Sequence, residues 1–299
     1  FVDKIYVVDD CSSDGTSALV CGYGQKDSAA GRVILIRQSE NQGVGAAIRS
    51  GYKAALQDGI DVVAVMAGDA QMDPDELHKI VGPVARDQTD YVKGNRLISG
   101  EAWKIIPRHR FLGNSILSLF TKISSGYWHV ADSQTGYTAI SAEALRLLPL
   151  DTLYPRYGYP NHLLVMLNVF NLRVMDVIVR PVYNVGETSG IRLKKVVPTI
   201  SWLLFRSFWW RMMEKYVIRD FHPLVFFYTL AFILLPLGAL LGSYLVLYRL
   251  FYGPVAITSA LLAVFLLVSG LQFLLFAMMF DMEANRDLKG DSTRRRSNT

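Results

Sequence analysis

The stretch from His222 to Phe280 constrains the fold most, because its 59 residues contain one fully charged side chain, that of Arg249. The part of the chain before it carries 25 Lys/Arg and 22 Asp/Glu and has the composition of an ordinary folded domain. The figure of 51% hydrophobic residues is therefore an average over two regions of different composition. Such a composition argues against a disordered, fibrous or nucleic-acid-coating protein.

Two segments of this stretch are long enough to cross a membrane. Leu224–Tyr248 has 25 uncharged residues, and Phe251–Phe280 has 30. About 20 apolar residues suffice for a helix to span the hydrocarbon core of a bilayer. We predict two transmembrane helices at 222–280, separated at Tyr252-Gly253-Pro254. The alternative, two buried core helices, would need a large domain around them, which the chain lacks.

Basic residues flank the predicted spans asymmetrically. Nine lie outside the pair and one, Arg249, lies in the turn between the spans. The nine are Arg206, Arg211, Lys215, Arg219, Arg286, Lys289, Arg294, Arg295 and Arg296. Because basic residues accumulate on the cytoplasmic side, we expect an integral membrane protein with the folded domain, both termini and the polar tail 281–299 in the cytoplasm.

The first part of the chain alternates short apolar runs with helical patterns. We predict strands at Ile5–Val8, Val33–Ile36 and Val62–Met66, with helices at Asp14–Tyr23 and Val44–Gln57 between them. This βαβ pattern is typical of an α/β fold with a parallel sheet covered by helices on both faces.

The pattern continues through residue 141. Asp73-Pro74 should begin a helix that ends near Arg86, with Asp73 as its N-cap. We predict strands at Tyr91–Lys93 and Tyr137–Ile140, with a helix over the apolar-rich stretch Leu112–Ile123 between them.

The segment 192–221 mixes basic residues with aromatic ones such as Trp202, Phe205 and Trp209. This mixture suits the headgroup layer of a membrane, and we predict one or two amphipathic helices lying on its surface, interrupted at Pro198. The alternative is an ordinary amphipathic helix packed on the folded domain, which would use the same residues.

Polar residues follow the apolar runs at three places, and ligands of open α/β sheets bind at strand ends. The first place is Asp9-Asp10, where a carboxylate could accept hydrogen bonds from a nucleotide base or ribose. Taken alone, the pair also fits a phospho-acceptor receiver domain or a simple helix cap.

The second place is Asp69 with Gln71, and the third is Asp132. Asp69 and Gln71 offer oxygen ligands two residues apart, which suits Mg²⁺ or Mn²⁺ bridged to a diphosphate. The alternative is a plain turn. Asp132 could act as a base or as an acceptor that orients another group.

These stretches, in this order, resemble the family 2 glycosyltransferases with a GT-A (nucleotide-diphospho-sugar transferase, Rossmann-like) fold, most closely the polyprenyl-phosphate branch typified by dolichol-phosphate mannose synthase. The segments that carry the resemblance are VVDDCSSDGT at 7–16, NQGVGAAIRSG at 41–51, GDAQMDPDEL at 68–77, VKGNR at 92–96, DSQTGYTAIS at 132–141 and GETSGIR at 186–192. The resemblance covers nearly all of residues 1–192, and we place the GT-A domain at 1–191.

The resemblance implies roles for individual residues of the donor site. Asp10, with Asp9 beside it, matches the contact to the nucleotide base. Asp69 matches the last Asp of the metal-binding Asp-X-Asp element, and Gln71 is its usual companion. Arg96 matches a basic residue near the phosphates.

It also implies an acceptor site. Asp132 matches the acidic residue near the acceptor, and Arg108 or Arg110 could be a second basic residue at the phosphates. Ser189 and Arg192 match the end of the domain and are assigned to the acceptor phosphate.

Two departures from the family pattern stand out. Ala67 replaces the first Asp of Asp-X-Asp, so a metal would depend on Asp69, Gln71, water and the diphosphate. The family's first strand, with its Pro-Ala-Tyr-Asn-Glu-like nucleotide contact, is expected to precede Phe1 and so to lie outside residues 1–299.

The combined prediction is an enzyme that transfers a sugar from a nucleotide-sugar donor to a polyprenyl phosphate, dolichyl or undecaprenyl, with inversion and a divalent metal, at the cytoplasmic face. Nucleic acid is excluded as a partner because the basic residues are interleaved with membrane-type aromatics. Two alternatives stay open: a non-catalytic membrane scaffold, suggested by Ala67, and a transferase acting on a polysaccharide or glycan.

Overall fold

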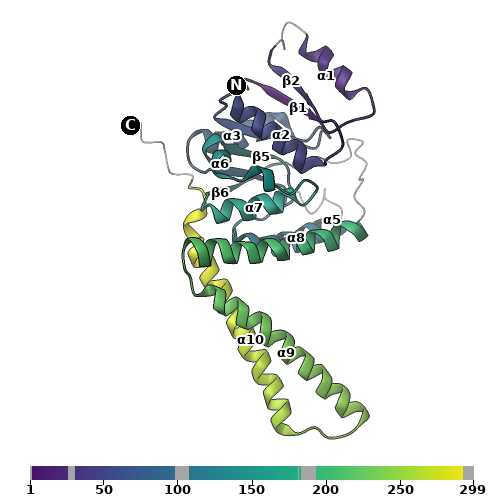
Figure 1. The fold of residues 1–299 in the computed structure, drawn as a ribbon, viewed down its shortest axis with the longest axis vertical. Helices are drawn as coiled ribbons and strands as arrows, with labels where there is room; N and C mark the ends of the chain where they lie inside the picture. The colour runs from purple at the N-terminus through teal and green to yellow at the C-terminus, as the bar shows by residue number, and fades with distance from the viewer. Residues whose placement is uncertain (1, 26–30, 98–107, 181, 183–192, 292–299) are drawn as a thin grey trace. The chain divides into compact units, whose positions relative to one another are not determined.

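The computed structural model describes residues 2–25, 31–97, 108–180, 182 and 193–291 (Figure 1). The predicted site residues Ser189 and Arg192 lie outside the described residues. The chain divides into two compact units, one of Phe1–Trp209 with Asp287–Thr299 and the other of Trp210–Arg286.

The first unit contains two sheets among its described residues. A parallel pair is formed by β1 (Ile5–Asp9) and β2 (Val33–Arg37). A second sheet has the strand order β3-β5-β4-β6. Its strands are β3 (Val62–Val65), β4 (Tyr91–Asn95), β5 (Thr138–Ser141) and β6 (Val174–Ile178). The strands predicted from apolar runs are therefore confirmed.

The predicted parallel pairing is found between β1 and β2 and between β4 and β6, but it does not extend to β5. Strand β5 runs antiparallel to both of its neighbours, with Thr138 opposite Val65 of β3 and opposite Lys93 of β4. The strand direction depends on how the segment between β4 and β5 returns to the sheet, which a run of apolar residues does not encode. As a consequence, the ends of β3 and β4 and the start of β5 share one edge of the sheet.

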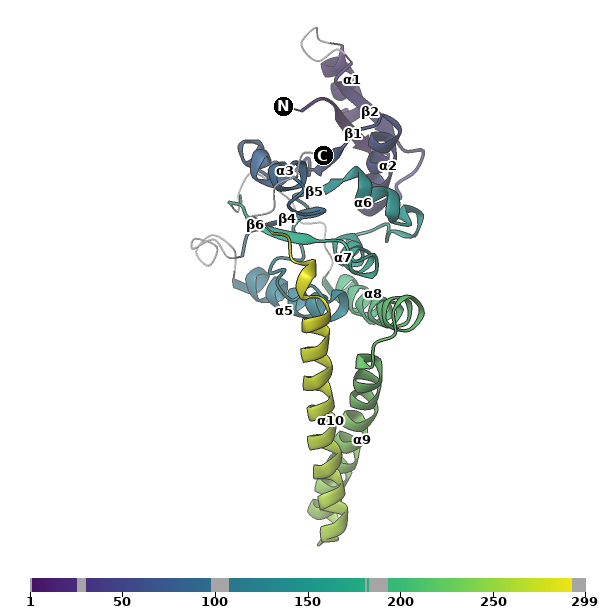
Figure 2. The ribbon, with the colours of Figure 1, turned by 90° about the vertical axis from the view of Figure 1, so that its left-hand side faces the viewer.

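Helices accompany these strands (Figures 1 and 2). Those of the first unit are α1 (Thr16–Gly24), α2 (Val44–Gln57), η1 (Pro74–Glu76), α3 (Leu77–Ala85), α5 (Arg108–Ser125), α6 (Ala142–Leu147), η2 (Leu150–Thr152) and α7 (Tyr159–Val169). Of these, α1, α2, α3 and α5 were predicted, whereas α6, η2 and α7 were not. The predicted cap at Asp73 is confirmed, because its carboxylate accepts a hydrogen bond from the Asp75 backbone N–H at 2.9 Å.

The core of the first unit lies on the four-stranded sheet. Helix α7 is buried along its whole length, and Ile80 of α3 packs in a cluster with Val92 of β4 and Ala139 of β5. Burying a large apolar side chain contributes about 1.5–3 kcal/mol to the free energy of folding. This cluster therefore stabilises the sheet whose strand ends carry the candidate site.

Helix α8 (Leu193–Met213) is continuous, so the predicted interruption at Pro198 was wrong. Pro198 is the sixth residue of α8, so its missing N–H costs one hydrogen bond to the residue four positions earlier, and the rest of the 21-residue helix continues past it. Met213 is followed by a π-helical segment, η3 (Glu214–Arg219).

The second unit contains two long apolar helices, α9 (Leu224–Phe251) and α10 (Ile257–Ala284), each long and apolar enough to cross a membrane. The chain breaks between them at Gly253, whose φ of +125° favours glycine. Two glycines allow the helices to approach closely. A Cβ on Gly238 would lie 2.9 Å from the Leu267 backbone nitrogen, and a Cβ on Gly270 would lie 2.9 Å from that of Leu235.

A polar cluster ties η3 and the end of α8 to the end of α10 within the second unit. Arg211 donates two hydrogen bonds to the Asp281 carboxylate, at 2.8 and 3.0 Å, and the Tyr216 hydroxyl donates to the same group at 3.0 Å. Lys215 donates to the Asn285 side chain at 2.8 Å. A buried charge near the end of a long apolar helix is therefore paired, as its desolvation requires.

Candidate active site

Asp9, the last residue of β1, shapes the loop that follows. Its carboxylate is buried and accepts hydrogen bonds from the Ser12 N–H at 2.8 Å and from the Ser17 hydroxyl. The bonds from Ser12 and then Ser17 lower the pKa of Asp9 to about 2. Asp9 is therefore an ionised acceptor for its own loop at any physiological pH.

Asp10 joins the loop after β1 to the loop before α2. Its two carboxylate oxygens accept hydrogen bonds from the backbone N–H groups of Gln42 and Gly43, each at 2.8 Å. Gly43 has a φ of +98°, which other residues rarely adopt. Both Asp9 and Asp10 thus have structural partners, and the predicted contact to a nucleotide base stays a prediction.

Asp69 and Gln71 lie in the exposed turn after β3. The Asp69 carboxylate accepts a hydrogen bond from the Gln71 N–H at 3.1 Å, and Ala70 between them has a φ of +58°. In the described part of the chain, no group of three or more His, Cys, Asp or Glu side chains could hold a metal ion. One carboxylate and one amide still match Mg²⁺, which commonly takes one or two carboxylates, several waters and substrate phosphates.

Asp132 and Arg96 form an ion pair at the same sheet edge. Arg96 follows β4, and Asp132 precedes β5. The Arg96 Nε donates to Asp132 Oδ2 at 2.9 Å, and the Arg96 backbone N–H donates to the same oxygen at 3.3 Å. Asp132 is fully buried, whereas the Arg96 side chain is 20% exposed. The pair therefore holds a partly exposed cation at the end of the sheet where β3, followed by the turn of Asp69, also ends.

The pKa of Asp132 lies below its ordinary value. Burial by itself would raise it, but the charge and hydrogen bonds of Arg96, helped by the charge of Lys93, outweigh burial. Asp132 is then ionised across the physiological range and already accepts the Arg96 hydrogen bonds. Of its two predicted roles, this geometry favours the orienting one over that of a base.

Two buried residues that the sequence analysis missed hold the loop around Asp132. Lys93 of β4 is fully buried and donates to the Thr135 carbonyl at 2.6 Å. Asp176, opposite Lys93 in β6, accepts from the Ala131 N–H at 2.7 Å. One strand pair thus fixes both ends of the loop 131–135. A lysine within an otherwise apolar strand was the available signal.

Burial changes the pKa values of both groups. It lowers the pKa of Lys93 to about 8, with the nearby carboxylates of Asp132 and Asp176 opposing the shift. It raises the pKa of Asp176 to about 6, against the hydrogen bond from Ala131. Asp176 therefore changes its charge near pH 6 and Lys93 near pH 8, while Asp132 stays ionised between them.

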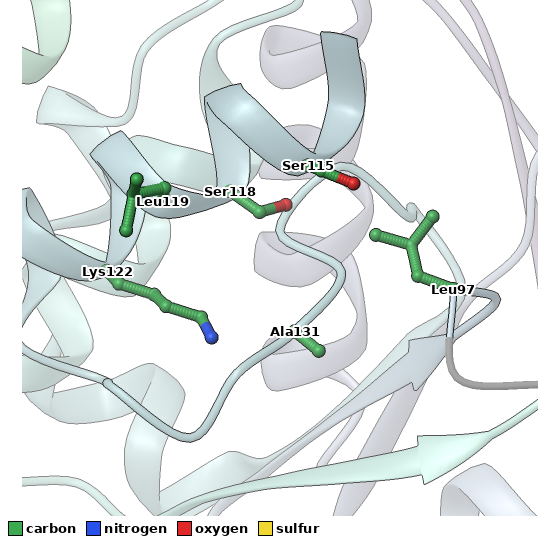
Figure 3. A pocket seen from close by; sticks show the side chains of 6 residues that line it. All are labelled: Leu97, Ser115, Ser118, Leu119, Lys122 and Ala131. Atoms are coloured by element: carbon green, nitrogen blue, oxygen red, sulfur yellow. The ribbon is translucent and has the colours of Figure 1, made fainter. Parts of the chain in front are cut away.

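A pocket of about 230 Å³ lies next to this loop. Figure 3 shows its lining: Ser115, Ser118, Leu119 and Lys122 from α5, Leu97 after β4, and Ala131 beside Asp132. The Ser118 hydroxyl lies 3.1 Å from that of Ser133, which joins α5 to the loop. The pocket combines apolar walls with the positive charge of Lys122, a combination suited to an amphipathic anion.

Among the predicted site residues, Arg96 contacts Asp132 and Asp69 contacts Gln71. The loops of Asp69 and Asp132 are connected, because the Tyr137 hydroxyl donates to the Asp73 carbonyl at 2.8 Å. Arg108 and Arg110 lie in the first turn of α5, but their side chains are outside the described structure.

Comparison with known proteins identifies a glycosyltransferase. The family model described as "Glycosyl transferase family 2" matches residues 2–148. The chain belongs to this family and has a GT-A fold, as its motifs predicted.

The chain is similar to transferases that act on polyprenyl phosphates, by the names of those proteins. A UDP-N-acetylglucosamine–dolichyl-phosphate N-acetylglucosaminyltransferase of Methanococcus voltae is 30% identical over 190 residues, which are 60% of this chain and 75% of that protein. An undecaprenyl-phosphate mannosyltransferase of Micrococcus luteus is 29% identical over 156 residues, 52% of this chain and 62% of that one. Among solved structures, the mannosyl-3-phosphoglycerate synthase of Rubrobacter xylanophilus is 16% identical with a TM-score of 0.49, covering 74% of this chain and 66% of that one.

Proposed function

We propose that this protein transfers a sugar from a nucleotide-sugar donor to the phosphate of a polyprenyl phosphate, with inversion at the sugar carbon. The observation that carries the proposal is the pairing of Asp132 with Arg96. A site whose acidic residue is ionised and bound to arginine offers a positioned cation, whereas transfer to a sugar hydroxyl needs a base. A lipid phosphate needs none, because its second pKa of about 6 leaves it largely dianionic at pH 7.

Each residue then has a defined task. Asp132 holds Arg96 so that its guanidinium faces the phosphates of the donor, and Lys93 and Asp176 keep the loop of Asp132 in place. Asp69 and Gln71 would hold a divalent metal, Mg²⁺ or Mn²⁺, which when bound stabilises negative charge on the departing diphosphate. Asp9 and Asp10 shape the loop that receives the nucleotide.

The acceptor side is assigned to the pocket on α5. Its apolar wall suits the first isoprenoid units, and Lys122 suits the phosphate. We assign Arg108 or Arg110, Ser189 and Arg192 to the same phosphate, following the family pattern. The names of the relatives in Methanococcus voltae and Micrococcus luteus support a polyprenyl-phosphate acceptor.

The membrane hairpin would keep this site where the lipid acceptor lies. Nine basic residues outside the spans and one in the turn favour a cytoplasmic location for the catalytic domain, both termini and the tail. We divide the chain into the transferase domain 1–191, the surface segment 192–221, the hairpin 222–280 and the tail 281–299.

The test is a panel of labelled nucleotide sugars, UDP- and GDP-linked, incubated with the purified protein, polyprenyl phosphate and Mg²⁺ or Mn²⁺. The proposal predicts label in the organic phase with one donor and matching release of UDP or GDP. Label that stays in an aqueous polymer would instead support a polysaccharide acceptor. Absence of nucleotide release with every donor would support a non-catalytic scaffold.

A further inference from the structure

Asn95, the last residue of β4, has a fully buried polar side chain. Burying an amide is costly unless its donor and its acceptor are both used. Both are used here, because Oδ1 accepts a hydrogen bond from the Leu97 N–H at 3.0 Å and Nδ2 donates to Oδ2 of Asp176 at 2.7 Å. Asn95 therefore joins the chain that follows β4 to strand β6.

The bond to Leu97 bends the chain at Arg96. An asparagine oxygen that accepts the N–H two residues further along forms an Asx turn, which redirects the backbone at the residue between them. That residue is Arg96, whose own N–H donates to Oδ2 of Asp132 at 3.3 Å. The side chain of Asn95 thus sets the direction in which Arg96 leaves the sheet.

The bond to Asp176 connects the same turn to the loop of Asp132. Oδ2 of Asp176 also accepts the N–H of Ala131, the residue directly before Asp132, at 2.7 Å. One carboxylate oxygen thus receives both the amide of Asn95 and the backbone of the loop. Together with the ion pair between Arg96 and Asp132, these bonds close a ring that runs from β4 to the neighbouring β6, on to the loop and back (Figure 2).

The position of Asn95 in this ring requires an amide. Aspartate, which has the same shape, could accept from Leu97 but would face the carboxylate of Asp176 at 2.7 Å. Two carboxylates at that distance repel each other unless they share a proton. Leucine, which has a similar size, would leave the Leu97 N–H without its acceptor and take one of the two bonds from Asp176.

We propose that Asn95 is a positioning residue, which sets the direction of the Arg96 guanidinium by holding the turn after β4 to the loop of Asp132. Because its side chain has no exposed surface, Asn95 acts through Arg96 and not on a substrate. Misplacing a group of an active site by about 1 Å can lower the rate by about 10²-fold. The effect on rate rests on the proposed function, whereas the effect on Arg96 rests on this geometry alone.

The test compares three variants of the full chain. Asn95→Leu removes both bonds. Asn95→Ser is the milder change, because its hydroxyl can still accept from Leu97 but is too short to reach Asp176. Asn168→Leu is the matched control, because Asn168 of α7 is fully buried like Asn95 but lies outside the ring.

The first measurement follows Arg96 by the ¹H–¹⁵N signal of its Nε–H group in protein labelled with ¹⁵N-arginine. Arg96→Lys assigns this signal by removing it. The hydrogen bond to Asp132 should shift the proton downfield and slow its exchange with water. We predict that both effects are lost in Asn95→Leu, weakened in Asn95→Ser and kept in Asn168→Leu. An Arg96 signal that is unchanged in both Asn95 variants would overturn the positioning role, whether or not the protein transfers sugar.

The second measurement is the rate of sugar transfer below the melting temperature of each variant. We predict that kcat falls about 10²-fold in Asn95→Leu but falls little further when Asn95→Leu is added to Arg96→Lys, because Asn95 acts through Arg96. Asn168→Leu should lower the melting temperature and leave kcat unchanged.

An unchanged kcat in Asn95→Leu, or an equal loss in the Arg96→Lys background, would overturn the positioning role. A wild type that transfers no sugar, while its Arg96 signal follows the predicted pattern, would overturn the proposed function and leave the positioning of Arg96 intact.

Discussion

Arg96 Nε donates a hydrogen bond of 2.9 Å to the buried carboxylate of Asp132, from the end of one strand to the loop before its neighbour. The two residues therefore act as one unit. We expect Asp132→Asn and Arg96→Lys each to lower kcat/KM for sugar transfer by about 10²–10³-fold, the usual effect of losing one stabilising donor. The double variant should be about as active as either single one.

A second arginine–aspartate pair provides the control for this comparison of single and double variants. Arg173 contacts Asp90 at 2.8 Å at the opposite edge of the sheet, before β4 and β6 begin. Arg173→Lys should lower the melting temperature and leave KM and kcat near those of the wild type. If the loss of kcat/KM in the double variant equals the product of the two single-variant losses, Asp132 and Arg96 act independently, and the coupled role is contradicted.

The raised pKa of Asp176 makes stability depend on pH. Its pKa of about 6 in the folded protein exceeds the unfolded value of about 3.9, so the folded state binds the proton more tightly. The wild type should therefore gain stability relative to Asp176→Asn as pH falls from 7 to 4.5, on the order of 1–2 kcal/mol. Thermal melts of both proteins at several pH values measure this difference. A difference that stays constant with pH would show that Asp176 is not perturbed.

Gly270 should be essential for packing of the hairpin. A Cβ there would approach the Leu235 backbone nitrogen to 2.9 Å, so Gly270→Ala must push α9 and α10 apart. We expect a loss of about 1–3 kcal/mol in the free energy of unfolding, measured by titration with sodium dodecyl sulfate. Gly242→Ala is the matched control, because a Cβ at Gly242 meets nothing within 4 Å. Equal stability of the two variants would contradict the close packing.

Much of this fold could be predicted because local patterns decide it. Helix α2 begins at Val44 and ends at Gln57 as its periodicity predicted, and the cap at Asp73 was read from Asp-Pro. The break at Gly253 followed from Gly-Pro between two apolar stretches. These features depend on residues close together in the chain.

The features that were missed depend on distant partners. The direction of β5 is set by its pairing with β3 and β4. The roles of Lys93 and Asp176 became visible only when the register placed them opposite each other. The orientation of α5 likewise depends on Leu204 of α8, 80 residues beyond Ser124, because the Ser124 hydroxyl donates to its carbonyl. Sequence periodicity finds the two faces of a helix but does not say which face is buried.

The most direct test of the central claim is transfer of labelled sugar in proteoliposomes that contain polyprenyl phosphate or the unphosphorylated polyprenol, with wild-type protein and Asp69→Ala side by side. With the productive donor and divalent metal, we predict organic-phase label only with the wild type and the phosphate, and a loss of about 10²-fold or more in Asp69→Ala. Equal labelling of the alcohol, or full activity of Asp69→Ala, would contradict the proposed reaction and its site.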